Sequence, residues 1–192
     1  MKLAKTLALT ALATLLPAAA YAHPGHDVVG FPAGFAHPFS GLDHILAMVA
    51  VGIWAGQVGG RYIWQAPLAF LTLMALGGIA GIQGLGLPMV ELGIAGSIIV
   101  FGVLIALAVR PVAWIGMAVT GLFAIFHGYA HGAEMHPDGS AVAYGLGFIA
   151  ATAILHGAGI GVALGLNRLR FAPVERALGA AIAVAGVVIA AG

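Results

Sequence analysis

Apolar residues dominate six long stretches of the chain, and short turns containing glycine, proline or arginine separate them. Each stretch approaches the ~20 residues that a helix needs to cross the apolar core of a bilayer. The pattern therefore predicts an all-α fold, a polytopic membrane bundle of six transmembrane helices. The predicted helices cover about 38–58, 64–81, 88–109, 112–133, 140–166 and 174–190.

A shorter apolar segment stands before the first of these helices. Lysines lie near its beginning, residues 7–16 form its apolar core, and an Ala-x-Ala site occupies residues 20–22. This order of features is typical of a secretory signal peptide that is cleaved after small residues. We expect residues 1–22 to be this signal peptide and residues 23–192 to form one domain. The alternative is a retained first transmembrane helix.

The composition agrees with a membrane protein. The chain is 62% hydrophobic and 7% charged, with a mean hydropathy of +1.10, whereas a soluble domain carries roughly 25% charged residues. The formal net charge is only +1, and the chain has no polybasic run. The sequence therefore lacks the basic patch that is typical of nucleic-acid-binding proteins. The absence of cysteine excludes disulfides and thiolate metal sites. No nucleotide-binding motif is present, so we expect no nucleotide partner. The hydropathy predicts that the helices are surrounded by the lipid bilayer.

The arginines fix the expected orientation of the helices. If the mature amino terminus lies outside, every arginine falls in a loop after the first, third or fifth helix: Arg61, Arg110, Arg168, Arg170 and Arg176. Cytoplasmic loops of membrane proteins are enriched in such residues. We therefore expect a multi-pass protein of the bacterial inner membrane with both termini on the outer, periplasmic side.

Histidines are unusually common for so apolar a chain. On the helix predicted over 112–133, His127, His131 and Glu134 are spaced i, i+4 and i+7 and share one face. Ionisable groups inside a membrane are costly, which indicates a functional reason. Imidazole and carboxylate without thiolate favour Ni²⁺, Co²⁺ or Zn²⁺. The eight histidines are His23, His26, His37, His44, His127, His131, His136 and His156.

Two other predicted helices carry possible metal ligands near their outer ends, at the same predicted depth in the membrane. The helix predicted from Pro38 carries His37, Asp43 and His44 near its outer end, and on a continuous helix His37 and His44 would share a stripe with Met48. Glu91 lies in the first turn of the third helix, where the helix dipole also favours a carboxylate for purely structural reasons. These segments together predict an outer metal site.

Further histidines are secondary candidates. His156 lies deeper, on a stripe with Thr152, and is either an inner relay or a buried histidine bonded to a backbone carbonyl. His23 and His26 follow the predicted cleavage site, where they either capture a metal ion or belong to a solvated tail.

Three blocks of sequence resemble the signature of the HupE/UreJ family of nickel permeases: residues 37–44 (HPFSGLDH), 126–134 (FHGYAHGAE) and 147–156 (GFIAATAILH). The resemblance covers essentially the whole chain. It implies nickel uptake for hydrogenase or urease maturation, with cobalt as an alternative cargo. It also implies the transport residues, namely His37, Asp43, His44, Glu91, His131 and Glu134, with Phe70 lining the path. Met48 and Thr152 are expected to line the same path.

The expected function is therefore a secondary permease that imports Ni²⁺ through a histidine and carboxylate site on the periplasmic side. Its expected partner is the divalent ion, with homo-oligomerisation left open, and we expect no catalytic cofactor and no enzymatic activity. The alternative is a membrane-embedded hydrolase that uses His127, His131 and Glu134 around Zn²⁺. A third class, a metal sensor, would be expected to carry a signalling domain. Against the hydrolase, Gly128 stands where the H-E-x-x-H motif has its general base.

Overall fold

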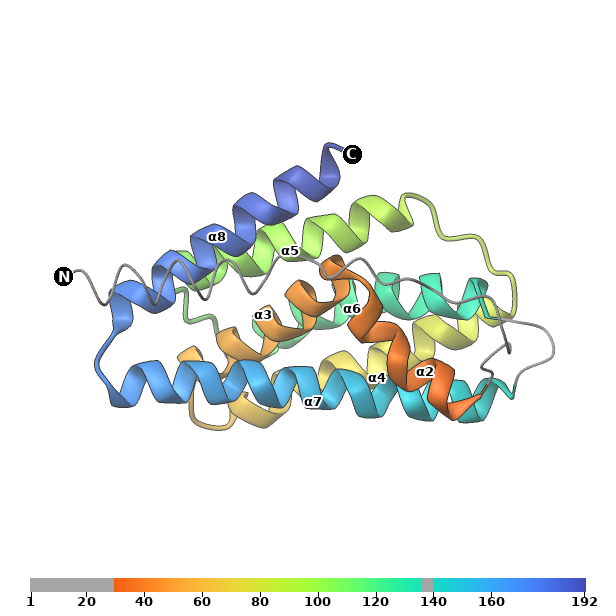
Figure 1. Cartoon of the computed structure of the whole chain (residues 1–192), viewed down its shortest axis with the longest axis horizontal. Coiled ribbons are helices and arrows are strands. Elements are labelled where there is room, and N and C mark those ends of the chain that lie inside the picture. Colours follow the sequence, from red (N-terminus) through yellow and green to blue (C-terminus); the bar gives the residue numbers. More distant parts are fainter. Residues whose placement is uncertain (1–29, 136–139) are drawn as a thin grey trace.

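The structure is a computed structural model that describes residues 30–135 and 140–192, and it forms seven helices without strands in those ranges. The predicted all-α class is confirmed. The predicted signal peptide, residues 1–22, lies outside the described residues, as do His23 and His26. The helices are α2 (Phe31–Ser40), α3 (Leu42–Val58), α4 (Tyr62–Ile82), α5 (Val90–Ala106), α6 (Ala113–Ala133), α7 (Ala141–Arg168) and α8 (Ala172–Ala190) (Figure 1).

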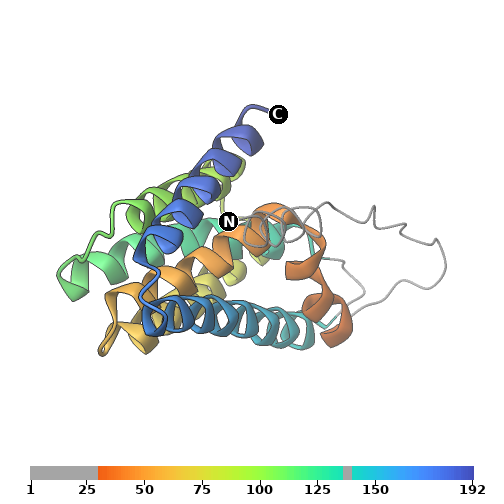
Figure 2. The ribbon, with the colours of Figure 1, turned by 60° about the vertical axis from the view of Figure 1, so that its left-hand side comes forward.

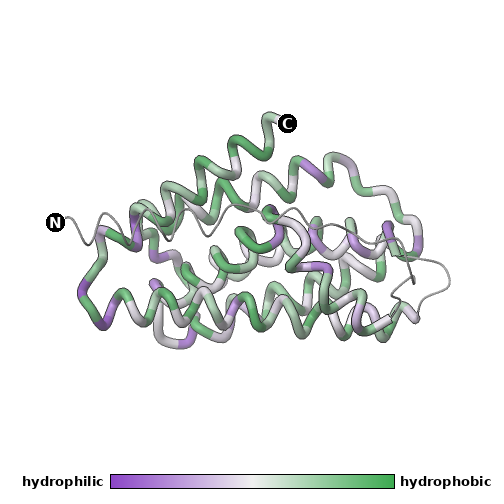
Figure 3. The backbone as a smooth tube through the Cα atoms, viewed as in Figure 1, coloured by the Kyte–Doolittle hydropathy of each residue, from purple (hydrophilic) through white to green (hydrophobic). Residues whose placement is uncertain are grey.

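The outer surface of the bundle is apolar, as expected for a membrane protein. Hydrophobic colour covers most of the tube in Figure 3, and large apolar side chains such as Trp64, Leu68 and Leu76 are more than half exposed. Four helices are long and apolar enough to span a bilayer, namely α4, α6, α7 and α8, and the bent pair α2–α3 raises this number to five. The remaining helix, α5, is apolar and has 17 residues.

The prediction of one continuous helix over residues 38–58 is wrong. The chain turns by 86° between α2 and α3, and Gly41 at the turn has an extended backbone with φ −113° and ψ 131°. Pro38 lies inside α2 instead of at the first turn of the long helix. Asp43 and His44 crowd the position where a side chain on Gly41 would lie, so glycine permits this close turn. Figures 1 and 2 show α2 directed away from α3.

The break moves α2 onto a different partner. Gly34 of α2 faces the backbone of Tyr144, and Gly147 of α7 faces the backbone of Phe31, so close that an added Cβ would clash in either place. Lipid provides no hydrophobic drive between helices, and such close backbone contact supplies the packing energy instead. Consequently α2 lies along the amino-terminal half of α7, and His37 of α2 faces His131 of α6.

Candidate metal centre

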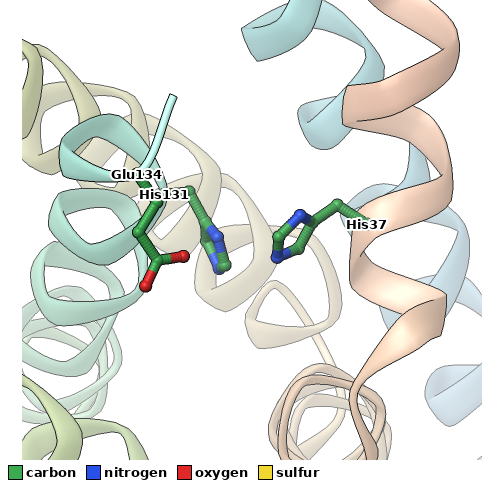
Figure 4. Close-up of side chains that lie close together, drawn as sticks. All are labelled: His37, His131 and Glu134. Atoms are coloured by element: carbon green, nitrogen blue, oxygen red, sulfur yellow. The ribbon is translucent and has the colours of Figure 1, made fainter. Parts of the chain in front are cut away.

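Three possible metal ligands converge where α2 meets the end of α6. Ligand atoms of His37, His131 and Glu134 all lie within 4.8 Å of one another. Figure 4 shows the His37 ring extending from α2 toward the two α6 side chains. His131 is buried, His37 is half-buried and Glu134 is exposed, so the group opens to the surface on its carboxylate side. Within residues 30–135 and 140–192, this is the one such cluster of histidine and acidic ligands.

His44 joins the cluster through a direct contact with His131. Their Nε2 atoms are 2.6 Å apart, and both rings are buried. On its other side, Nδ1 of His44 lies 2.9 Å from Oδ1 of Asp43. A carboxylate that accepts the proton of one ring nitrogen fixes the tautomer and the orientation of the ring. Asp43 is therefore a positioning residue for His44.

The pairing also determines which nitrogen of His131 can bind a cation. If Nδ1–H of His44 donates to Asp43, its Nε2 is an acceptor, and Nε2–H of His131 must donate to it. Nδ1 of His131 is then left with a lone pair. This atom is buried and has no hydrogen-bond partner in the part of the chain that the structure describes. A cation would satisfy it.

Aromatic rings from α7 surround the imidazoles. The Phe148 ring centroid lies 4.3 Å from that of His131, and the Tyr144 centroid lies 6.2 Å from that of His37. The three imidazoles are themselves close, with centroids 4.4 Å apart for His37 and His131 and 4.5 Å for His44 and His131. Tyr144 was missed by the sequence analysis because it lies outside the three blocks of resemblance.

His127 lies one turn deeper than His131 and is hydrogen-bonded to a residue of α5. Its ring centroid is 5.4 Å from that of His44, and its Nε2 is 3.0 Å from Oγ of Ser97 on α5. The Ser97 hydroxyl donates to the carbonyl of Ile94 at 2.6 Å, so it accepts from His127. Ser97 was also missed. A polar residue in the middle of the apolar α5 was the signal that could have revealed it.

Glu91 is not brought into the His37–His131–Glu134 group. It is exposed and lies in the first turn of α5, where a carboxylate interacts favourably with the positive end of the helix dipole. Helix α5 instead contacts the buried His127 through Ser97, six residues after Glu91. Ser97 can do so because the inward face of this helix begins at Ile94.

The remaining path candidates lie deeper in the bundle than the His37–His131–Glu134 group. Phe70 is fully buried, with its ring centroid 5.7 Å from that of His127 and 5.0 Å from that of His156. Met48 on α3 and Thr152 on α7 are also fully buried, and the Thr152 hydroxyl lies 4.0 Å from the sulfur of Met74 on α4. His156 has no hydrogen-bond partner on either ring nitrogen among the described residues. The interpretation of His156 as a histidine held by a backbone carbonyl is therefore wrong.

The arginines gather at the end of the bundle opposite the cluster. Arg176 at the start of α8 donates from Nε to the carbonyl of Ala106 at the end of α5, at 2.7 Å. At the same end Nε1 of Trp54, near the end of α3, donates to the carbonyl of Val109 at 2.9 Å. The His37–His131–Glu134 group therefore lies at one end, and the arginines lie at the other, where the buried carboxylate of Glu175 is also found.

The fold and the site define a class, namely an apolar helical membrane protein with a histidine and carboxylate cluster near one end. The family model "HupE / UreJ protein" matches residues 10–189. The chain is also 47% identical over 197 residues to Protein HupE of Rhizobium leguminosarum bv. viciae, with 100% of each protein covered. No solved structure matches the chain. The chain belongs to the HupE/UreJ family of hydrogenase and urease accessory proteins, so the predicted resemblance is confirmed.

Proposed function

We propose that this protein is a secondary permease that imports Ni²⁺ across the bacterial inner membrane and supplies hydrogenase or urease maturation. The observation that carries the proposal is the convergence of His37, His131 and Glu134, whose ligand atoms lie within 4.8 Å of one another. Two imidazoles and a carboxylate, without thiolate, suit Ni²⁺, and Co²⁺ or Zn²⁺ would meet the same donors.

The graded exposure of the ligands supports capture from solution. An incoming ion meets the exposed Glu134 first, then the half-buried His37, and then the buried His131. It can exchange its hydration waters one at a time, because each step offers a protein ligand. Conduction requires sites that bind well enough to admit the ion and weakly enough to release it. A partly open group of three ligands fits this requirement better than a closed cage.

Six crossings with both termini outside remain our proposal for the topology. In this arrangement α2 and α3 form one broken span, and its bend holds His37 and His44 beside α6. Helix α5 has 17 residues, which is the lower end of the range that crosses a bilayer. The arginines at the opposite end from the cluster support a cytoplasmic position for that end.

The hydrolase alternative receives less support from the geometry. It required His127, His131 and Glu134 to share one metal, but the group that converges contains His37 in place of His127. His127 is hydrogen-bonded to Ser97 instead.

Uptake of radioactive nickel by cells tests the proposal. Glu134→Gln removes the charge of the entry ligand and His131→Ala removes the buried one, and each is expected to lower uptake about tenfold or more. Tyr129→Phe is the matched control on the same helix, because Tyr129 is outside the cluster, and it should transport like the wild type. Wild-type uptake by both site variants at equal expression would contradict the proposal.

A further inference from the structure

Ser97 is the one polar residue of α5 beyond its first turn, and it is fully buried. Its Oγ atom lies 2.6 Å from the carbonyl oxygen of Ile94 and 3.0 Å from Nε2 of His127 on α6. Two oxygen atoms approach this closely only when a proton lies between them, and a carbonyl has no proton to give. The Ser97 hydroxyl therefore donates to Ile94, and its lone pair accepts from the Nε2–H of His127.

This arrangement determines the tautomer of His127. A neutral imidazole carries one proton, so a proton on Nε2 leaves Nδ1 with a free lone pair. The ring is fully buried, and Nδ1 has no hydrogen-bond partner among the described residues. In the other tautomer the Nε2 lone pair would face the lone pair of Ser97, and both ring nitrogens would be buried without a partner. Buried polar groups are rarely left in that state.

The same pattern occurs at His131, one turn nearer the end of α6. Its Nε2 lies 2.6 Å from Nε2 of His44 on α3, and its Nδ1 is also buried without a partner in the described chain. Residues four apart on a helix lie on one face, with Cβ atoms about 5–6 Å apart. Helix α6 therefore carries two successive imidazoles whose Nε2 atoms contact other helices and whose Nδ1 atoms are unpaired.

Close packing of α5 against α6 brings Ser97 to His127. Gly93 lies one turn before Ser97, and an added Cβ at Gly93 would overlap the ring of Phe126, the neighbour of His127. The hydroxyl does not need His127 for its own pairing, because a serine on a helix can bond to a carbonyl of the preceding turn, here that of Ile94. The contact between the two helices therefore serves the imidazole.

We propose that Ser97 is a positioning residue for transport, which holds His127 in its Nε2–H tautomer so that Nδ1 of His127 accepts the ion after His131. The proposal rests on the proposed nickel transport and adds an inner step to it. Ser97 itself does not bind the ion. Loss of such a supporting hydrogen bond to a metal-binding histidine typically costs about 10–100-fold in metal affinity or activity.

Nuclear magnetic resonance of the full-length protein in lipid, with ¹⁵N-labelled histidine, tests the tautomer without nickel. The ¹⁵N shifts distinguish a protonated from a bare ring nitrogen, and the His127 signals are those that His127→Gln removes. We expect a protonated Nε2 and a bare Nδ1 at His127 in the wild type and in Ser97→Thr, which keeps a hydroxyl. Ser97→Ala should give a mixture of tautomers. A wild-type His127 protonated on Nδ1, or a tautomer that Ser97→Ala leaves unchanged, would overturn the proposal.

Transport kinetics test what the tautomer does. Ser97→Ala leaves the His37–His131–Glu134 group intact, so the half-saturation concentration of nickel uptake should stay near the wild-type value. The maximal rate should fall about tenfold or more at equal expression. Gly96→Ala is the matched control on α5, because an added Cβ there would meet only Phe123, at 3.8 Å, and it should transport like the wild type. An unchanged maximal rate in Ser97→Ala would contradict the role of Ser97.

A double variant shows whether Ser97 acts through His127. His127→Gln removes the imidazole and should lower the maximal rate at least as much as Ser97→Ala does. The two substitutions together should be no slower than His127→Gln alone, because no imidazole is then left to position. Multiplied losses in the double variant would overturn the proposal. Failure of the wild-type protein to take up nickel would instead refute the proposed function, so the two failures are distinguishable.

Discussion

At the scale of single residues, the site depends on how hydrogen bonds assign the imidazole protons. When Asp43 accepts the Nδ1 proton of His44, Nε2 of His44 accepts from His131, and the remaining nitrogen of His131 is left for a cation. The types of these residues were predictable, since histidines and carboxylates are conspicuous in an apolar chain. Their individual roles were not predictable, because hydrogen-bond direction depends on distances between residues that are far apart in the sequence.

Asp43→Asn is expected to weaken nickel binding without removing a direct ligand from the three-residue group. The amide can no longer hold the His44 tautomer through a charged hydrogen bond, and loss of such a supporting partner typically costs 10–100-fold in metal affinity. The half-saturation concentration of nickel uptake should rise by about this factor. Asp43→Glu keeps the charge and should retain more affinity than Asp43→Asn. Equal half-saturation for wild type and Asp43→Asn would show that Asp43 does not position His44.

At the scale of the elements, glycines decide which helices meet. Small residues four apart, as Gly128 and Gly132 are, are a sequence signal of close helix packing, and the structure shows both glycines of α6 against the backbone of α4. The break at Gly41 had no comparable signal, because one glycine in a helical pattern is usually tolerated. The helices themselves were predictable from apolar length, whereas the turn between α2 and α3 depended on the packing of α2 against α7.

Gly128→Ala is expected to destabilise the protein, because the added methyl group would overlap the backbone of Met74 and Gly78 on α4. Overpacking of this kind typically costs about 1–3 kcal/mol. The shift should also disturb the neighbouring His127 and His131, so nickel uptake should fall. Thermal unfolding of the purified protein in detergent measures the first effect.

Gly157→Ala on α7 is the matched control, because an added Cβ there would meet open space. Alanine favours helix over glycine by roughly 1 kcal/mol, so this variant should be as stable as the wild type or slightly more stable. Equal melting temperatures for the two variants would contradict the role of Gly128 in bringing α4 and α6 together.

At the scale of the whole molecule, the distribution of charge along the bundle matches the direction of the proposed transport. The His37–His131–Glu134 group lies near one end and the arginines near the other, with His127, Phe70 and His156 in the interior. The proposed orientation comes from the arginines alone, since the positive-inside rule depends only on which loops carry them. The close approach of Phe70 to both His127 and His156 was not predictable from the sequence.

Reporter fusions test the proposed orientation. Alkaline phosphatase, which is active only outside the cytoplasm, should be active when fused after Gly192 and inactive when fused after Arg170. Green fluorescent protein should give the reverse pattern. Phosphatase activity at both positions would show that α8 does not cross the membrane in the proposed sense.

The sequence by itself determined the membrane class, the approximate helices, the ligand types and the family, because hydropathy, charge position and motif spacing are local properties. The tertiary structure decided the bend at Gly41, the partnership of Ser97 with His127, and the position of Phe70 between His127 and His156. It also placed His37 beside His131 and left Glu91 outside that group. These contacts join helices that are distant in the chain, and they depend on how closely the backbones can pack, which no local pattern specifies.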